Sequence, residues 1–211
     1  MIEFCGYSKS FGQEPVLQIN NFCFEQGIYW LRGKNGSGKS TLLKSMAALL
    51  SFDGDIIIHQ KYLKKETRLC RSWVGFGYAE PVFPTFLTGR DMISFFQKTK
   101  GVVPGQLDML STALEAGYFL NQQIGTYSSG MIKKLSLILA FTGRPKWVLL
   151  DEPFNALDGQ AVTALINMIQ QLHREQGVQL VLSSHPQSQA MLPAGLTQLE
   201  IRNGSLHHYG S

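Results

Sequence analysis

The sequence predicts an α/β fold with a parallel β-sheet, and three features of the chain lead to this prediction. Two short apolar runs, residues 147–150 and 178–182, have the composition of central strands that are buried on both faces. A helical stretch at residues 160–175 lies between them and provides the crossover that parallel strands require. A third apolar segment, residues 28–31, leads directly into a glycine-rich turn. We therefore expect functional side chains at the carboxyl ends of these strands.

The first part of the chain reads as strands followed by a helix. Within the first thirty residues, Phe22 and Phe24 alternate with polar neighbours, a pattern that predicts strands with one buried face. After the glycine-rich turn, apolar side chains recur at helical spacing over residues 43–50. A strand, a glycine-rich turn and an amphipathic helix thus follow one another.

The middle of the chain, from about residue 81 to residue 141, reads mostly as helix. Thr88 and Asp91 form a variant of the capping box in which Asp91 replaces the usual Glu or Gln. Near the carboxyl end, Asn203 and Gly204 stand between two apolar segments and predict the tight turn of a β-hairpin. No repeat or linker interrupts the chain, so we expect a single domain over residues 1–211.

Composition favours an ordinary soluble domain. The 211 residues are 44% apolar and 16% charged, with a net charge of +4 that fits a solvated surface or a weak preference for anionic surroundings. Three scattered cysteines argue against a disulfide framework or a zinc site and fit a reducing cytoplasm. We expect no signal peptide, because no basic and apolar leader is present. We expect no membrane span, because no run reaches ~18 apolar residues.

Residues 33–40 read GKNGSGKS and match the phosphate-binding pattern G-x-x-x-x-G-K-[ST] at every fixed position. Glycines let the backbone curl so that its amides point at phosphate oxygens, and the following helix adds its positive end. A chance glycine-rich loop is the alternative, but the strand before and the helix after favour a phosphate loop. The predicted nucleotide-binding residues of this segment are Gly33, Asn35, Gly36, Ser37, Gly38, Lys39, Ser40 and Thr41.

Within this set two side chains have predicted chemical roles. Lys39 reaches the β- and γ-phosphates and is a candidate catalytic residue, and the Ser40 hydroxyl is a candidate magnesium ligand.

Two carboxylates follow the apolar run at residues 147–150. Asp151 suits a second magnesium contact, whereas Glu152 suits the general base that activates the attacking water. The alternative is a pair of strand-end acids that cap the next helix, and the phosphate loop makes it less favoured. His185, at the end of the next strand, is a candidate catalytic partner of the γ-phosphate or of the water, although a lone histidine is more often structural.

Residues 127–131, Tyr-Ser-Ser-Gly-Met, resemble the LSGGQ motif of the ATP-binding cassette (ABC) family; we call them the signature segment. They lie about twenty residues before Asp151, as in that family, and open an amphipathic helix. The segment departs from the pattern at three positions, but Ser128 and Gly130 keep the positions suited to a phosphate contact. The resemblance implies that Ser128, Ser129 and Gly130 cap the ATP of an opposite subunit; an ordinary Ser-capped helix is the alternative.

Other positions also resemble the family. Phe11 matches the aromatic residue that stacks on adenine, although a core aromatic would look the same. Asp158 closes a segment similar to the D-loop, and Ser184-His185 is similar to the switch histidine. Glu80 stands where the family usually has a glutamine that senses magnesium, so the implied magnesium ligands are Ser40, Glu80 and Asp151.

The resemblance covers essentially the whole chain and implies a P-loop NTPase (RecA-like) core with a parallel sheet. It further implies an amino-terminal antiparallel β subdomain and a helical subdomain at roughly residues 82–140 that carries the signature segment. The implied cofactors are ATP and Mg²⁺, and the implied activity is ATP hydrolysis between two cassettes paired head to tail, as a homodimer or a heterodimer.

The resemblance also implies partners and a location. A short single cassette looks like a transporter subunit of the exporter type, whose partner is a transmembrane permease subunit. The chain would then be cytoplasmic and peripheral on the inner face of the cell membrane, with no nucleic acid expected. A soluble ABC-type ATPase of cofactor assembly, translation or repair is the alternative, and a non-hydrolytic nucleotide sensor is a weaker one.

Overall fold

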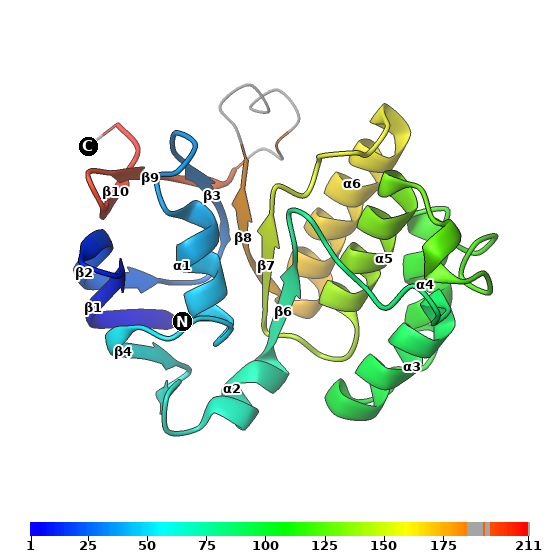
Figure 1. Ribbon diagram of the computed structural model, residues 1–211, viewed down its shortest axis with the longest axis horizontal. Coiled ribbons are helices and arrows are strands. Elements are labelled where there is room, and N and C mark those ends of the chain that lie inside the picture. Colours follow the sequence, from blue (N-terminus) through cyan, green and yellow to red (C-terminus); the bar gives the residue numbers. More distant parts are fainter. Residues whose placement is uncertain (185–191, 193–194, 211) are drawn as a thin grey trace.

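The computed structural model describes residues 1–184, 192 and 195–210, and Figure 1 shows two β-sheets in this part of the chain. The first sheet is antiparallel, with the strand order β2-β1-β4-β5. Its strands are β1 (Ile2–Phe11), β2 (Glu14–Phe24), β4 (Asp53–Ile58) and β5 (Lys61–Tyr62). The alternation around Phe22 and Phe24 therefore belongs to a strand, as predicted.

The second sheet has the strand order β10-β9-β3-β8-β7-β6 among the described residues. Strands β6, β7, β8, β3 and β9 are parallel, whereas β10 is antiparallel to β9, so the predicted parallel sheet is confirmed. Asn203 and Gly204 join the last two strands, and both have positive φ angles (50° and 74°), as a two-residue hairpin turn requires. The strands are β3 (Ile28–Arg32), β6 (Val74–Gly77), β7 (Trp147–Asp151), β8 (Gln179–Ser183), β9 (Thr197–Arg202) and β10 (Ser205–His208).

Helices connect the strands and cover the second sheet. The predicted capping box is present: Thr88 Oγ1 accepts a hydrogen bond from the Asp91 amide, and the Asp91 carboxylate accepts one from the Thr88 amide. The helices are α1 (Lys39–Met46), α2 (Thr67–Trp73), α3 (Gly89–Lys100), α4 (Gln106–Ala113), the 3₁₀ turn η1 (Ile124–Thr126), α5 (Ser129–Phe141) and α6 (Gly159–Gln176).

Helix α1 is shorter than the apolar spacing over residues 43–50 predicts. It ends at Met46 because Ala48 adopts a left-handed conformation (φ 56°). The Leu49 amide then donates to the Lys44 carbonyl, and the Ala48 amide donates to the Ser45 carbonyl. These bonds close the helix as a Schellman motif, so the last predicted turn is wrong.

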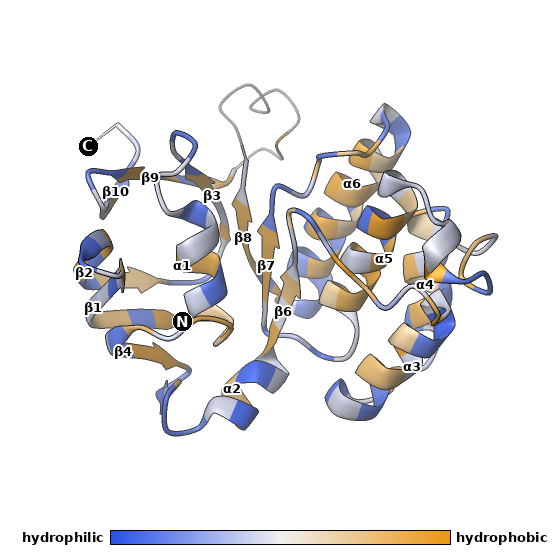
Figure 2. Cartoon of the chain, in the orientation of Figure 1, coloured by the Kyte–Doolittle hydropathy of each residue, from blue (hydrophilic) through white to orange (hydrophobic). Residues whose placement is uncertain are grey.

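Two hydrophobic cores lie on opposite faces of the second sheet. On β7, Trp147 and Leu149 pack into a core with α1 and the first sheet, whereas Val148 and Leu150 pack into a core with α3 to α6. Figure 1 shows α1 between the two sheets and α5 and α6 on the other side of β7. Figure 2 shows hydrophobic colour along β7 and β8, in agreement with strands buried on both faces.

Candidate functional site

The phosphate loop between β3 and α1 is a tight backbone cradle. Gly33 and Gly38 have φ angles of 155° and 103°, which side-chain-bearing residues rarely adopt. A Cβ atom at Gly33 would overlap the Ser37 side chain, and one at Gly38 would lie 2.9 Å from Leu17 Cδ2. The backbone conformation therefore favours glycine at both positions, and a Cβ atom at either one would also force a neighbouring side chain to shift.

Polar groups in this cradle are suited to an anion. Lys39 begins α1, is only 6% exposed, and its ammonium donates to the carbonyls of Gly33 (2.8 Å) and Lys34 (3.2 Å). The buried Ser37 hydroxyl has no hydrogen-bond partner within the described residues. The eight-residue helix α1 also points its amino-terminal amides at the loop. An ammonium, a buried hydroxyl and a helix amino terminus together fit a polyphosphate.

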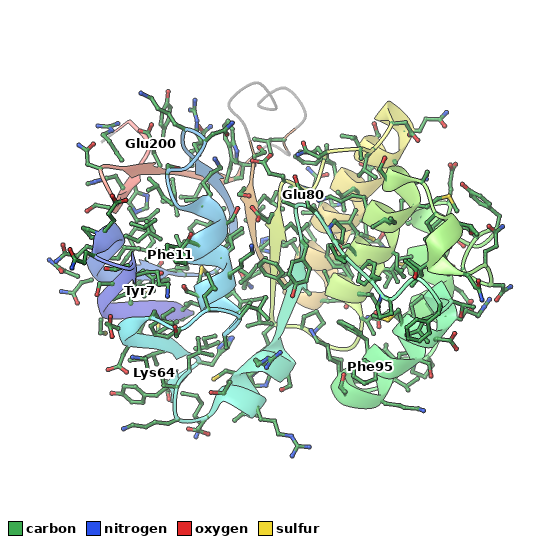
Figure 3. All side chains as sticks on the ribbon, in the orientation of Figure 1. Tyr7, Phe11, Lys64, Glu80, Phe95 and Glu200 are labelled. Atoms are coloured by element: carbon green, nitrogen blue, oxygen red, sulfur yellow. The ribbon has the colours of Figure 1, made fainter. Side chains whose placement is uncertain are left out.

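A cavity of about 490 Å³ opens in front of the loop. Predicted site residues from four parts of the chain line it: Phe11 at the end of β1, the phosphate loop, Glu80 after β6 and Glu152 after β7. Figure 3 labels Phe11, at the end of β1 in the first sheet, and Glu80, beyond the end of β6. The lining residues are Phe11, Val16, Asn35, Gly36, Ser37, Gly38, Lys39, Ser40, Thr41, Ala79, Glu80, Glu152 and Asn155.

The aromatic ring of Phe11 is 53% exposed and belongs to no hydrophobic core, unlike the core aromatic that the sequence left open. The Lys9 ammonium lies 4.9 Å from the centre of this ring. An exposed ring at the mouth of a polar cavity is suited to stacking on a planar base.

The adjacent carboxylates Asp151 and Glu152 occupy different environments. Asp151 is the last residue of β7, is 1% exposed, and its carboxylate accepts a hydrogen bond of 2.6 Å from the Ser183 hydroxyl. Glu152 has a positive φ angle (45°), and its amide donates to both the carbonyl and the hydroxyl oxygen of Ser183. This turn brings Glu152 to the cavity wall, whereas Asp151 is not among the residues that line it.

Oxygen donors suited to magnesium come from separate elements. The Ser40 hydroxyl and the Glu80 carboxylate line the same cavity. Among the described residues, no group of three or more His, Cys, Asp and Glu side chains is placed to hold a metal ion. Magnesium commonly takes only one or two protein ligands and completes its shell with phosphates and water. The donor set therefore fits magnesium bound together with a nucleotide.

The signature segment lies apart from the cavity, because none of its residues is among those that line it. Ser128 is the N-cap of α5, and its hydroxyl accepts a hydrogen bond from the Met131 amide. Gly130 lies against the loop after β7: a Cβ atom there would be 2.9 Å from the Ala156 carbonyl. Ser129 starts the helix next to them. One chain therefore does not bring this segment to its own phosphate loop.

Tyr127 occupies the position that is Leu in the LSGGQ pattern, and the structure shows what the phenol contacts. Its ring is 8% exposed, and its hydroxyl donates to the Phe119 carbonyl (2.8 Å). The same oxygen accepts a hydrogen bond from the Gly89 amide, at the first turn of α3 (3.1 Å). Tyr127 thus ties the start of α5 to the start of α3.

Two further expectations concern Asp158 and His185, and one residue that was not expected, Lys133, also lies near the site. Asp158 is the N-cap of α6, and the hydrogen bond from the Ala161 amide lowers the pKa of its carboxyl. His185 lies outside the described residues. Lys133 of α5 was not predicted as a site residue, yet it is 2% exposed, and burial lowers the pKa of its ammonium to about 8.

The cavity also contains residues that the sequence did not indicate. Val16 comes from β2 and Ala79 from the segment before Glu80. Asn155 belongs to the stretch similar to the D-loop, which was the only signal for it.

A phosphate cradle at the carboxyl end of a parallel strand, with carboxylates from two neighbouring strand ends, defines a nucleotide-binding cassette of the P-loop class. A sequence model of the ABC transporter family matches residues 17–155. The chain therefore belongs to the ABC transporter family.

Curated relatives agree with this assignment. The ABC transporter ATP-binding protein YhcH of Bacillus subtilis is 27% identical, over 88% of this chain and 62% of that protein. The bacitracin transport ATP-binding protein BcrA of Enterococcus faecalis is 30% identical, over 88% of this chain and 61% of that protein. The lantibiotic transport ATP-binding protein SrtF of Streptococcus pyogenes is 27% identical, over 88% of this chain and 80% of that protein. The chain spans about three fifths of the length of the first two relatives.

Solved structures share the fold. A bacterial ABC transporter cassette solved as a dimer superposes with a TM-score of 0.87 at 22% identity, covering 99% of this chain and 97% of that chain. A dimeric post-hydrolysis cassette bound to ADP and phosphate gives a TM-score of 0.86 at 21% identity, with both chains covered completely. These likenesses confirm the predicted P-loop α/β fold.

Proposed function

We propose that this chain binds ATP with magnesium, hydrolyses it between two cassettes, and thereby drives a transporter whose channel lies on a separate membrane subunit. The observation that carries the proposal is the cavity in which the phosphate loop, Phe11, Glu80 and Glu152 meet. The names of the relatives, which include bacitracin and lantibiotic transport proteins, support coupling to transport.

The residues of the cavity divide the chemical work. Phe11 offers a face for the adenine, and the loop amides with the Lys39 ammonium hold the phosphates. Ser40, Glu80 and Asp151 would hold magnesium, which when bound neutralises phosphate charge. Glu152 accepts the proton of the attacking water, because it is the carboxylate that turns from the end of β7 to the cavity wall. His185 remains a proposed partner in this step.

The signature segment supports a dimer. Ser128, Ser129 and Gly130 begin a helix, and such an amino terminus is suited to a phosphate. They do not line the cavity of their own chain. A head-to-tail pair would place this segment of one cassette over the ATP of the other, with Asp158 near the contact. The solved cassettes of the same fold that are dimers support this arrangement.

A groove between α2 and α3 is the surface that we propose for the membrane subunit. Its volume is about 670 Å³, and its walls combine exposed apolar surface with an excess of basic side chains. Phe95, labelled in Figure 3, is 61% exposed in this groove. A short segment of the membrane subunit that carries apolar and acidic side chains would complement the apolar and basic walls of this groove. The basic residues are Arg68, Arg71, Lys98 and Lys100.

The proposed location follows from this partner. No helix in the described part of the chain is long and apolar enough to cross a bilayer. We propose that the chain is peripheral on the cytoplasmic face of the cell membrane, where it is held by the membrane subunit. The basic residues of the groove are compatible with that surface.

The experiment is affinity purification of the tagged Glu152→Gln chain from detergent-solubilised host membranes with MgATP. The variant should retain ATP, stabilise the dimer and keep weak partners. We expect a stoichiometric multi-span membrane protein, which should be lost with Lys39→Ala and with the double substitution Arg68→Glu and Arg71→Glu. Recovery of only soluble partners, ribosomes or DNA would overturn the transporter function and move the chain to the soluble ABC-type ATPases.

A further inference from the structure

A buried ammonium group lies behind the candidate catalytic carboxylates. The Lys133 side chain donates hydrogen bonds to three backbone carbonyls, those of Tyr78 (2.7 Å), Ala79 (3.3 Å) and Asp151 (3.2 Å). An ammonium carries three N–H bonds, so each of them has an acceptor. The residue is 2% exposed and does not line the nucleotide cavity.

Two of these carbonyls belong to the peptide groups that lead into the cavity carboxylates. The Ala79 carbonyl is part of the peptide bond to Glu80, and the Asp151 carbonyl is part of the peptide bond to Glu152. The N–H of the second peptide donates to Ser183. This peptide is therefore held on both sides, immediately before the residue that adopts a positive φ angle (45°). A non-glycine residue keeps such a conformation only where its surroundings hold it.

One face of α5 explains how Lys133 reaches these groups. Along β6 the helix packs closely: a Cβ atom at Gly75 would overlap the Ala140 carbonyl. Beyond the end of β6 the same face becomes polar, because Ser136 accepts a hydrogen bond from the Tyr78 amide (3.2 Å) while Lys133 donates to the Tyr78 carbonyl. Side chains of α5 thus make the hydrogen bonds to the Tyr78 backbone that a neighbouring strand would make inside a sheet.

Packing alone does not account for a lysine here. An apolar side chain would fill the space without the cost of burying a charge, but it would leave three carbonyls unpaired. The lysine therefore makes a specific connection between α5, which begins with the signature segment, and the ends of β6 and β7.

We propose that Lys133 is a positioning residue for hydrolysis: it fixes the peptide groups before Glu80 and Glu152 and so orients Glu152 relative to the cavity. This inference rests on the proposed ATPase function. The three hydrogen bonds of the Lys133 ammonium in the described part of the chain go to Tyr78, Ala79 and Asp151 and not to the phosphate loop. Loss of Lys133 should therefore misplace the base while nucleotide binding persists. A misplacement of about 1 Å can cost 100-fold in rate.

The test compares steady-state kinetics with MgATP and equilibrium binding of a fluorescent ATP analogue. In Lys133→Met we expect kcat to fall about 10-fold to 100-fold, while KM and the dissociation constant of the analogue stay within about threefold of wild type. Lys133→Arg, which keeps a charged donor, should recover most of kcat. Lys146→Met is the matched control, because it removes an exposed ammonium at the other end of β7.

A double-mutant cycle separates positioning from general damage. If Lys133 acts through Glu152, Lys133→Met should slow single-turnover hydrolysis much less in the Glu152→Gln background than in wild type. A kcat within twofold of wild type, an equal fall of kcat and nucleotide affinity, or an equal effect in both backgrounds would overturn the inference. If Lys133→Met does not fold, Lys133→Gln takes its place. A wild-type chain that never hydrolyses MgATP would instead overturn the proposed function.

Discussion

At the scale of single residues, the exit from β7 separates two neighbouring carboxylates. Asp151 stays buried with a hydrogen bond from Ser183, whereas Glu152 turns through a left-handed conformation to the cavity wall. Sequence adjacency therefore does not imply a shared role. We propose a magnesium contact for Asp151 and activation of the attacking water for Glu152.

The Glu152→Gln variant should bind MgATP with near-wild-type affinity and hydrolyse it at least about 100-fold more slowly, because an amide cannot accept the proton of the water. Calorimetry measures the affinity, and phosphate release measures the rate. Glu175→Gln, which changes an exposed carboxylate on α6, is the control and should retain full activity. Wild-type turnover by Glu152→Gln would remove Glu152 from the role of base.

The sequence predicted the strand before the phosphate loop and the helix after it, because the chemistry of such a loop requires fixed residues at fixed spacing. That these residues bind a nucleotide stays a prediction. It did not predict Val16, which reaches the cavity only because the hairpin of β1 and β2 lies beside the loop. Lys133 gave no signal either, because its acceptors at Tyr78 and Asp151 are distant in the sequence and meet it only in the folded chain.

At the scale of elements, Tyr127 joins two helices through backbone groups. Its hydroxyl bonds the Phe119 carbonyl and the Gly89 amide, so it connects the segment before α5 to the first turn of α3. The family pattern has Leu at this position, which lacks both hydrogen bonds. The departure from LSGGQ thus has a structural explanation in this chain.

Tyr127→Phe should lower the free energy of unfolding by about 1–3 kcal/mol, because it leaves the buried Gly89 amide without its partner, whereas the Phe119 carbonyl keeps its hydrogen bond from the Gln122 amide. Urea denaturation followed by circular dichroism measures the change. Tyr118→Phe is the control, since that ring is 70% exposed and its substitution should change the stability by less than about 0.5 kcal/mol. Equal stabilities of the two variants would contradict this account.

Among the elements, β7, β8 and α6 were predicted because their apolar patterns extend over whole segments, whereas β4, β5, β6 and α2 were not predicted. The end of α1 was predicted wrongly, since the apolar spacing continues to residue 50 while the backbone turns at Ala48. An alanine in the sequence does not indicate a left-handed conformation, because glycine or asparagine is more common at such positions.

At the scale of the whole molecule, Lys100 links the end of α3 to the start of β6. Its ammonium donates to the Val74 carbonyl (2.8 Å), and burial, with a smaller contribution from Arg71, lowers the pKa of Lys100 to about 8. The folded pKa is thus below the ordinary value of 10.5. Burial disfavours the charged ammonium, so this group destabilises the fold when it is protonated. The stability is therefore highest above the unfolded pKa, and it is lost as the pH falls through about 8.

The stability of wild type relative to Lys100→Met should therefore rise between pH 8 and pH 10.5, the window between the two pKa values. This increase in the difference between the two free energies of unfolding is at most ~3 kcal/mol. Solvent screening makes it smaller, because the Lys100 side chain is only partly buried. Urea denaturation of both proteins at pH 7.5, 9 and 10 measures it, and groups common to both cancel. A difference that stays constant or falls over this range would contradict the burial of the charged group.

The architecture as a whole was predictable in its central sheet and less so in its contacts. Continuous apolar runs indicated β7 and β8 correctly, because both faces of these strands are covered. The order of the strands and the place of α1 between the two sheets depend on pairings between distant segments, which no local pattern encodes.

The strand order has a consequence for the synthesis of the chain. The apolar strand β3 pairs with β8 on one side and with β9 on the other. Ile28 can therefore pair only after Leu180 has been synthesised, and Tyr29 can pair with β9 only after Thr197 has been synthesised. At typical translation rates of about 5–20 residues per second, the ribosome needs roughly 8–30 s to make the intervening chain. Throughout this interval β3 has two open edges, and a nascent chain in this state is prone to aggregation. Chaperones that bind short apolar segments should therefore be able to bind β3 until β8 and β9 have been made.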